Sequence, residues 1–197
     1  MNLPNTITLC RLVLTAVFVG GAALQSPMGH WIALVAFVIA AVSDWFDGSF
    51  ARKYGLITPL GRLLDPVADK VLVCAAFVYL SAQGNCPVWV TVLIVAREFL
   101  ITGLRQIAIE AGQVLSSDHL GKWKTGMQLG YCITCLVWFA VMTAPESTNP
   151  ALRLLYYLSN PESWLTPGFL WLALTLTVVS GWNYMWANRA LLTGSNQ

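Results

Sequence analysis

Six apolar segments of membrane-spanning length constrain the fold of this chain more than any other feature. They cover residues 7–24, 30–52, 65–82, 88–109, 120–142 and 168–189. A helix needs about 20 mainly apolar residues to cross a bilayer, where its backbone polar groups must bond to one another. The chain is 57% hydrophobic and only 10% charged, whereas about a quarter of the residues of a soluble domain are charged. We therefore expect an all-α integral membrane protein with six transmembrane helices, formed by one domain over residues 1–197.

The basic residues of the short connections orient this predicted bundle. One side receives Arg52, Lys53, Arg62, Arg105, Lys122, Lys124 and Arg189, and the other receives Arg153. Because Lys and Arg accumulate in cytoplasmic loops, we expect the more basic side to face the cytoplasm together with both termini. The net charge of +2 and the lack of a Lys/Arg tract argue against a nucleic-acid partner.

Four carboxylates gather where the second predicted helix ends and the third begins. They are two pairs, Asp44 with Asp47 and Asp65 with Asp69, in a chain with only nine acidic residues. Residues three or four apart share one helix face, so two helix ends could bring all four to one point. Such close negative charges repel unless cations lie between them. Since carboxylate oxygens suit hard divalent ions such as Mg²⁺ and Mn²⁺, the spacing predicts a one- or two-metal site. Asp65 is also the expected N-cap of the third helix, with Pro66 in its first turn.

The residues between these two acidic pairs suit phosphate binding. Gly48 allows a ligand or a neighbouring helix to approach the backbone closely, and Ala51 keeps the same region narrow. Arg52 offers a fixed positive fork for phosphate oxygens. A second glycine, Gly61, precedes the second acidic pair.

A second group of polar residues lies deeper in the predicted helices. It consists of Arg97 and Arg105 near one face of the fourth helix, and Lys122, Lys124 and Thr125 on the fifth. Charged groups at such depth are costly and usually line a polar cavity, so we interpret this group as an anion pocket for a second phosphate. Two alternatives remain open. The lysines could form a solvated basic helix end, and Glu98 could neutralise an arginine to stabilise the bundle.

The acidic stretch as a whole has the pattern D-x2-D-G-x2-A-R-x8-G-x3-D-x3-D over residues 44–69. It resembles the signature of the CDP-alcohol phosphatidyltransferases, with all eight fixed positions filled. The resemblance implies transfer of a phosphatidyl group from CDP-diacylglycerol to an alcohol with release of CMP. It also implies a homodimer and bound Mg²⁺ or Mn²⁺, expected as two ions.

Matching positions carry the family's roles onto particular residues of this chain. Asp44, Asp47 and Asp65 then correspond to metal ligands, and Asp69 to a ligand that is also the general base. The expected contacts to CDP-diacylglycerol are Gly48, Ala51, Arg52, Gly61 and Thr8. Thr8 belongs to the stretch Pro4-Asn5-x2-Thr8-x2-Arg11, which is similar to the usual start of the first helix in the family.

Four segments are most similar to the bacterial-type phosphatidylglycerophosphate synthases within this family. They are DWFDG at 44–48, LLDPVADKVLV at 63–73, AREFLITGLR at 96–105 and GKWKT at 121–125. This resemblance implies sn-glycerol 3-phosphate as the acceptor and a bacterial inner membrane as the location. An acceptor that carries a phosphate also fits the basic group on the fourth and fifth helices.

Three other functions compete with this one. The first is another enzyme of the family, of the cardiolipin or phosphatidylinositol-phosphate synthase type, which would use a different alcohol. The second is a cation transporter with an intramembrane acidic site. Its carboxylates would follow a path across the bilayer, and it would not need Gly48, Ala51 and Arg52. The third is a structural helix bundle, in which the repulsion between four clustered aspartates would only lower the stability of the fold.

Overall fold

The computed structural model describes residues 3–50, 59–110, 119–142 and 149–189, and this part of the chain is helical without strands. The helices are α1 (Leu3–Ala23), α2 (Pro27–Phe50), α3 (Pro59–Ala82), α4 (Val88–Glu110), α5 (His119–Val141), α6 (Pro150–Ser159) and α7 (Leu165–Ala187). The predicted all-α fold is confirmed, and each of the six predicted segments corresponds to one of the long helices.

The start of α3 differs from the prediction. The helix begins at Pro59, so Asp65 and Pro66 lie inside it and Asp65 is not its N-cap. Proline is favoured in the first turn of a helix, and Pro59 supplies that residue type before Pro66 does. Pro66 has no N–H group, so the interior of α3 lacks one backbone hydrogen bond at that point.

The short helix α6 lies within the connection predicted at residues 143–167. Its 10 residues correspond to about 15 Å, roughly half of what a bilayer core requires. The side chain of Asn149 caps it by accepting a hydrogen bond from the Ala151 amide at 3.0 Å, and Pro150 occupies its first turn. On its surface Leu154 and Tyr157 are exposed.

The long helices have 21 to 24 residues each, enough to match a bilayer in length. Among the described helices, α7 alone is both long and apolar enough to be a clear candidate for a membrane span. Shorter apolar stretches lie in α1, α2 and α3, at Leu9–Ala23, Pro27–Ser43 and Lys70–Ala82. In these three helices the polar residues are concentrated toward the end at which the acidic pairs lie. The count of six membrane-spanning helices therefore stays a prediction.

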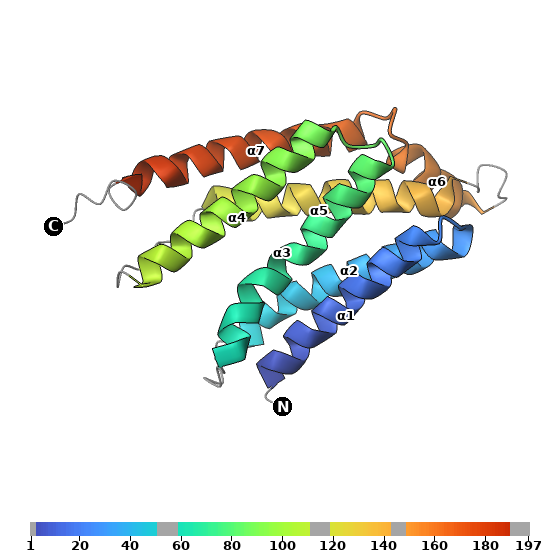
Figure 1. Cartoon of the computed structure of the whole chain (residues 1–197). Coiled ribbons are helices and arrows are strands. Elements are labelled where there is room, and N and C mark those ends of the chain that lie inside the picture. The colour runs from blue at the N-terminus through green and yellow to red at the C-terminus, as the bar shows by residue number, and fades with distance from the viewer. Residues whose placement is uncertain (1–2, 51–58, 111–118, 143–148, 190–197) are drawn as a thin grey trace.

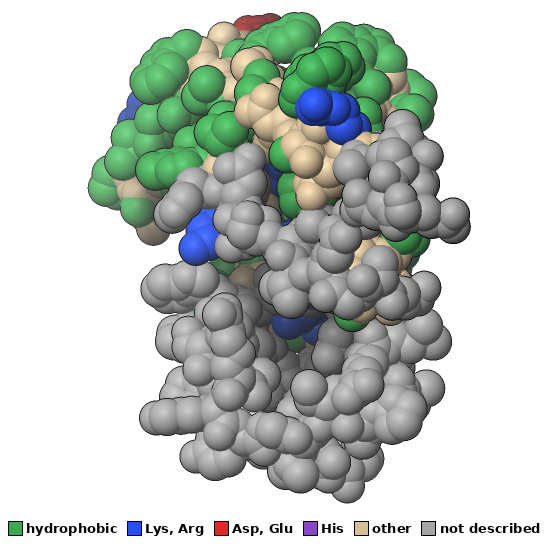
Figure 2. Space-filling model, turned by 90° about the vertical axis from the view of Figure 1, so that its left-hand side faces the viewer, with side chains coloured by type: hydrophobic (Ala, Val, Ile, Leu, Met, Phe, Trp, Pro, Cys, Tyr) green, Lys and Arg blue, Asp and Glu red, His purple; other side chains and the backbone are tan. Residues whose placement is uncertain are grey.

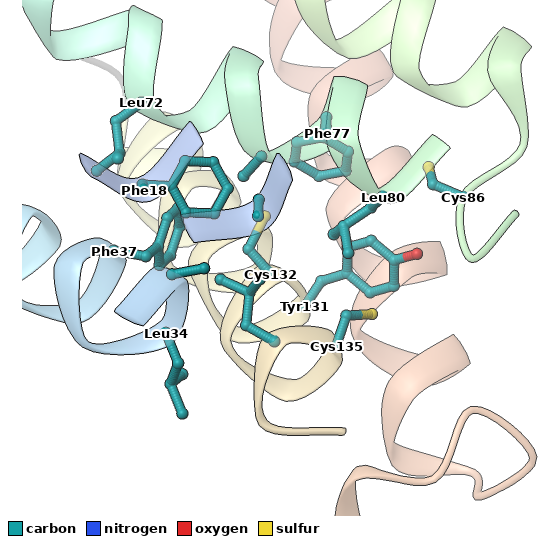
Figure 3. Packing of buried hydrophobic residues seen from close by; sticks show 14 of the residues in the cluster. Phe18, Leu34, Phe37, Leu72, Phe77, Leu80, Cys86, Tyr131, Cys132 and Cys135 are labelled. Atoms are coloured by element: carbon teal, nitrogen blue, oxygen red, sulfur yellow. The ribbon is translucent and has the colours of Figure 1, made fainter. Parts of the chain in front are cut away.

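Aromatic side chains from four helices form the main apolar core. The rings of Phe18 in α1 and Phe37 in α2 have centroids 5.6 Å apart, and Phe77 in α3 stacks on Tyr131 in α5 at 5.6 Å. Figure 3 shows these rings pointing toward one another, with Cys132 and Cys135 beside Tyr131. The Tyr131 hydroxyl donates a hydrogen bond to the Asn85 carbonyl at 2.9 Å. This bond ties α5 to the turn between α3 and α4.

The two ends of the bundle differ in what they contain. At one end lie the start of α1, the end of α2, the start of α3, the end of α4, the start of α5 and the end of α7 (Figure 1). The tight turns between α1 and α2 and between α3 and α4, together with α6, lie at the other end. We call the first end the motif end, because it carries both acidic pairs.

Candidate active site

The acidic pairs lie on two helices that are in contact. Asp44 and Asp47 belong to the last two turns of α2, and Asp65 and Asp69 to the first three turns of α3, and the two helices touch. The side chains of these four residues lie outside the described part of the structure. As a donor set, four carboxylates from two touching helices at one end of the bundle fit a hard divalent cation. Among the side chains that are described, no group of three or more His, Cys, Asp or Glu could hold a metal.

The predicted donor-binding residues also lie at the motif end where the structure describes them. Gly48 is in α2, Gly61 in α3 and Thr8 in α1, each by its backbone. Ala51 and Arg52 lie outside the described residues. The structure therefore shows on which helices the described donor-binding candidates lie, and their roles stay predictions.

A buried carboxylate, that of Glu98 in α4, is the centre of the described part of the site. Its Oε2 lies 3.2 Å from Nζ of Lys70, and its Oε1 lies 3.6 Å from Nη1 of Arg97. The ammonium group of Lys124 donates a hydrogen bond to Oε1. Cations from α3, α4 and α5 thus meet at one acidic side chain, and we call these four residues the Glu98 cluster.

Helix α7 supports the Glu98 cluster from the other side. Nη2 of Arg97 donates a hydrogen bond to Oγ of Ser180 at 3.0 Å. A β-carbon at Gly181 would lie 3.2 Å from Cγ of Arg97, so the glycine leaves room for the arginine against α7. One turn earlier on the same helix, Thr177 accepts a hydrogen bond from Nε2 of Gln128 at 3.2 Å. Hydrogen bonds between polar side chains therefore join α4 and α5 to α7.

The cluster combines burial with an excess of positive charge. The exposed fractions of its side chains are 3% for Glu98, 2% for Lys124, 16% for Arg97 and 32% for Lys70. Three cations and one carboxylate leave a net charge of +2 within the cluster. Buried charges need partners, and among the described contacts this one carboxylate faces three cations. Lys70, its most exposed member, directly follows Asp69, so the cluster adjoins the acidic motif.

The structure brings together two of the five residues predicted to bind the acceptor's phosphate. Arg97 and Lys124 meet at Glu98, as described above. Arg105 and Lys122 are exposed at the motif end, and Oγ1 of Thr125 donates to the Gly121 carbonyl of its own helix at 3.1 Å. Figure 2 looks at this end and shows Lys and Arg side chains, in blue, at several places on it. Glu98 does pair with Arg97, as the alternative interpretation proposed, but it pairs with two lysines as well.

Two features of the site were missed from the sequence. Lys70 appeared only as part of the segment LLDPVADKVLV at 63–73, although a lysine inside an apolar helix is itself a signal of a polar environment. Ser180 and Gly181 carry no such signal, because small residues are common in membrane helices. The packing of α4 on α7 brings them to Arg97, which is 83 residues from Ser180 in the chain.

Comparison with known proteins gives a family and several full-length relatives. The family model described as CDP-alcohol phosphatidyltransferase matches residues 1–179. A Bacillus subtilis protein named CDP-diacylglycerol–glycerol-3-phosphate 3-phosphatidyltransferase is 36% identical, over 99% of both chains. A Rickettsia bellii protein of the same name is 32% identical over 93% of both. A Mycobacterium tuberculosis protein named probable phosphatidylglycerophosphate synthase is 43% identical over 64% of this chain and 62% of its own length.

Proposed function

Because this chain belongs to the CDP-alcohol phosphatidyltransferase family, we propose that it makes phosphatidylglycerophosphate. The reaction transfers the phosphatidyl group from CDP-diacylglycerol to sn-glycerol 3-phosphate and releases CMP. The names of the Bacillus and Rickettsia relatives support this choice of acceptor. The structural observation that supports a phosphorylated acceptor is the Glu98 cluster, which has a net charge of +2 and lies next to the acidic motif.

The acidic pairs serve the donor in this proposal. Members of the family generally depend on a divalent metal, and Asp44, Asp47, Asp65 and Asp69 would hold Mg²⁺ or Mn²⁺, as two ions. When bound there, the metal supplies positive charge against the diphosphate and against the charge that develops during transfer. The contacts to the rest of CDP-diacylglycerol come from Thr8, Gly48, Ala51, Arg52 and Gly61.

The Glu98 cluster serves the acceptor. A phosphate monoester carries a charge of about −1.5 to −2 at pH 7, which complements the cluster's net +2. Arg97 offers a planar fork that can bind two phosphate oxygens at once, and Lys124 offers a compact ammonium group. Arg105 and Lys122, which are exposed at the same end, attract the anion toward the site. Thr125 adds a hydroxyl one residue after Lys124.

The chemistry that we propose needs one proton acceptor. Asp69 takes the proton from a hydroxyl of glycerol 3-phosphate. The resulting oxygen forms a bond to the phosphorus that carries diacylglycerol, while the bond from that phosphorus to the CMP oxygen breaks and CMP leaves. Because Lys70 belongs to the Glu98 cluster and directly follows Asp69, the bound phosphate and the proton acceptor are held by neighbouring residues of α3.

The family is a group of membrane proteins, and we propose that this one spans a bacterial inner membrane as a homodimer. The motif end would face the cytoplasm, where CDP-diacylglycerol headgroups and glycerol 3-phosphate are both accessible. The distribution of Lys and Arg supports this orientation. The first residues of α1 and the last residues of α7 lie at that same end, so they would face the cytoplasm with it.

Incorporation of labelled glycerol 3-phosphate into lipid tests the proposed function. The purified protein in detergent is incubated with CDP-diacylglycerol, divalent metal and the labelled acceptor, and the label in the organic phase is compared with CMP in the aqueous phase. We expect the two to rise together in equal amounts. CMP release without labelled lipid would mean that another nucleophile is the acceptor.

A further inference from the structure

We propose that Glu98 is the positioning residue for the acceptor's phosphate: it gathers Lys70, Arg97 and Lys124 and sets their combined charge at +2. The proposal rests on the proposed function, because it takes glycerol 3-phosphate to be the ligand of these cations. It assigns a role to a buried acidic residue that the reaction itself does not use.

The first argument is the convergence of three cations from three helices. Lys70, Arg97 and Lys124 lie on α3, α4 and α5, and each contacts the Glu98 carboxylate. Like charges this close repel, and the Glu98 carboxylate offsets that repulsion by contacting all three cations. Glu98 therefore holds the cations together before any phosphate is present. A site organised in advance loses less binding free energy to ordering its side chains.

The second argument is that both carboxylate oxygens are used. Oε1 faces Arg97 and Lys124, and Oε2 faces Lys70. A glutamine at this position would have one oxygen and one NH₂ group, and that NH₂ group would face a cation. Aspartate would keep both oxygens and the charge but would reach less far. The two substitutions thus separate the charge of Glu98 from its length.

The third argument is the second anchor of Arg97. Its guanidinium group lies between Glu98 and the Ser180 hydroxyl of α7, to which Nη2 donates at 3.0 Å. Gly181 leaves the space for this placement. A side chain that only neutralised Glu98 would not need a defined position on α7. The arrangement therefore favours presentation of the guanidinium fork in one orientation.

The fourth argument is the balance of charge. A phosphate monoester at neutral pH has a charge close to −2, so it would neutralise the cluster. Without Glu98 these three cations would carry +3, with Arg97 and Lys124 largely buried, and a single phosphate would leave about one positive charge unbalanced. An uncharged alcohol would leave the cluster at +2 and gain nothing from it. Glu98 thereby helps to determine which acceptor binds.

Steady-state kinetics of Glu98→Gln and Glu98→Asp test this role. Loss of hydrogen bonds to charged groups should raise the KM for glycerol 3-phosphate in Glu98→Gln by at least about tenfold, with the KM for CDP-diacylglycerol unchanged. Inorganic phosphate, tested as a competitor of the acceptor, should inhibit that variant less. Glu98→Asp should recover part of the acceptor affinity. Glu162→Gln, which changes an exposed glutamate outside the motif end, should match the wild type.

A second variant keeps the test decisive where Glu98→Gln does not fold. Ser180→Ala removes one anchor of Arg97 and should raise the KM for glycerol 3-phosphate alone, by a smaller factor. The proposal is overturned if Glu98→Gln binds glycerol 3-phosphate as well as the wild type or better, or if Ser180→Ala leaves that KM unchanged. Wild-type protein that fails with glycerol 3-phosphate would overturn the proposed function and this proposal together. If the wild type uses glycerol 3-phosphate and the Glu98→Gln variant has the same KM for it, the role proposed for Glu98 is overturned and the proposed function stands.

Discussion

The ammonium group of Lys124 in α5 donates a hydrogen bond to the Glu98 carboxylate in α4, and both side chains are almost completely buried. Removing one partner of a buried ion pair costs about 3–5 kcal/mol. Since Lys70 and Arg97 still contact Glu98, we expect Lys124→Met to destabilise the protein by about 3 kcal/mol. Thermal unfolding in detergent measures this. Lys122→Met, which changes an exposed lysine of the same helix, is the control. Equal unfolding temperatures for the two variants would contradict the structure.

Replacement of the proposed proton acceptor should separate activity from folding. Asparagine at position 69 keeps the shape of aspartate but cannot accept the proton and is a poorer metal ligand. General-base catalysis alone contributes about 10²–10⁴-fold, so Asp69→Asn should lose at least that much CMP release. Its expression and unfolding temperature should match those of the wild type. Near-normal turnover by this variant would remove Asp69 from the mechanism.

Metal removal should abolish the activity reversibly. We expect no CMP release in excess EDTA and full recovery on addition of Mg²⁺ or Mn²⁺, because four close carboxylates bind the donor's diphosphate only with cations between them. Asp44→Asn should raise the metal concentration needed for half-maximal activity. Activity that persists in the chelator would exclude the proposed role of the acidic pairs.

The packing of α1 on α2 gives a prediction about stability at the opposite end of the bundle. A β-carbon at Gly29 would lie 2.5 Å from the Gly21 carbonyl oxygen, whereas one at Gly20 would have no atom within 4 Å. Gly29→Ala should therefore force the helices apart and cost about 1–3 kcal/mol. Gly20→Ala in α1 is the matched control and should not lower the unfolding temperature. If both variants unfold like the wild type, the two helices do not pack as closely as described.

Much of the fold could be predicted from the sequence, because apolar runs and helix length are both set by local composition. The long helices follow the apolar segments, and the spacing of the acidic pairs led to the family that the comparison with known proteins confirms. The start of α3 was misplaced because two prolines, Pro59 and Pro66, could each begin a helix. Helix α6 was missed because its 10 residues are too few to cross a bilayer, whereas the prediction rested on apolar segments of membrane-spanning length.

The site was harder to predict, since its polar contacts join distant parts of the chain. Arg97 and Lys124 were predicted to lie deep in the bundle, because a charge inside an apolar helix is a local signal, and their side chains are largely buried. Their shared contact with Glu98 depends on how α4 and α5 pack, and the contact of Arg97 with Ser180 depends on α7. Pairing between helices of this kind is not encoded in residue spacing.

The most direct test of the account measures CMP release by the purified wild-type protein with a panel of alcohols. The panel holds CDP-diacylglycerol and Mg²⁺ or Mn²⁺ constant and compares sn-glycerol 3-phosphate with glycerol, serine, phosphatidylglycerol and inositol phosphate. We predict that release requires sn-glycerol 3-phosphate. Release with a different alcohol would contradict the proposed acceptor and the role of the Glu98 cluster, and no release with any of them would contradict phosphatidyl transfer itself.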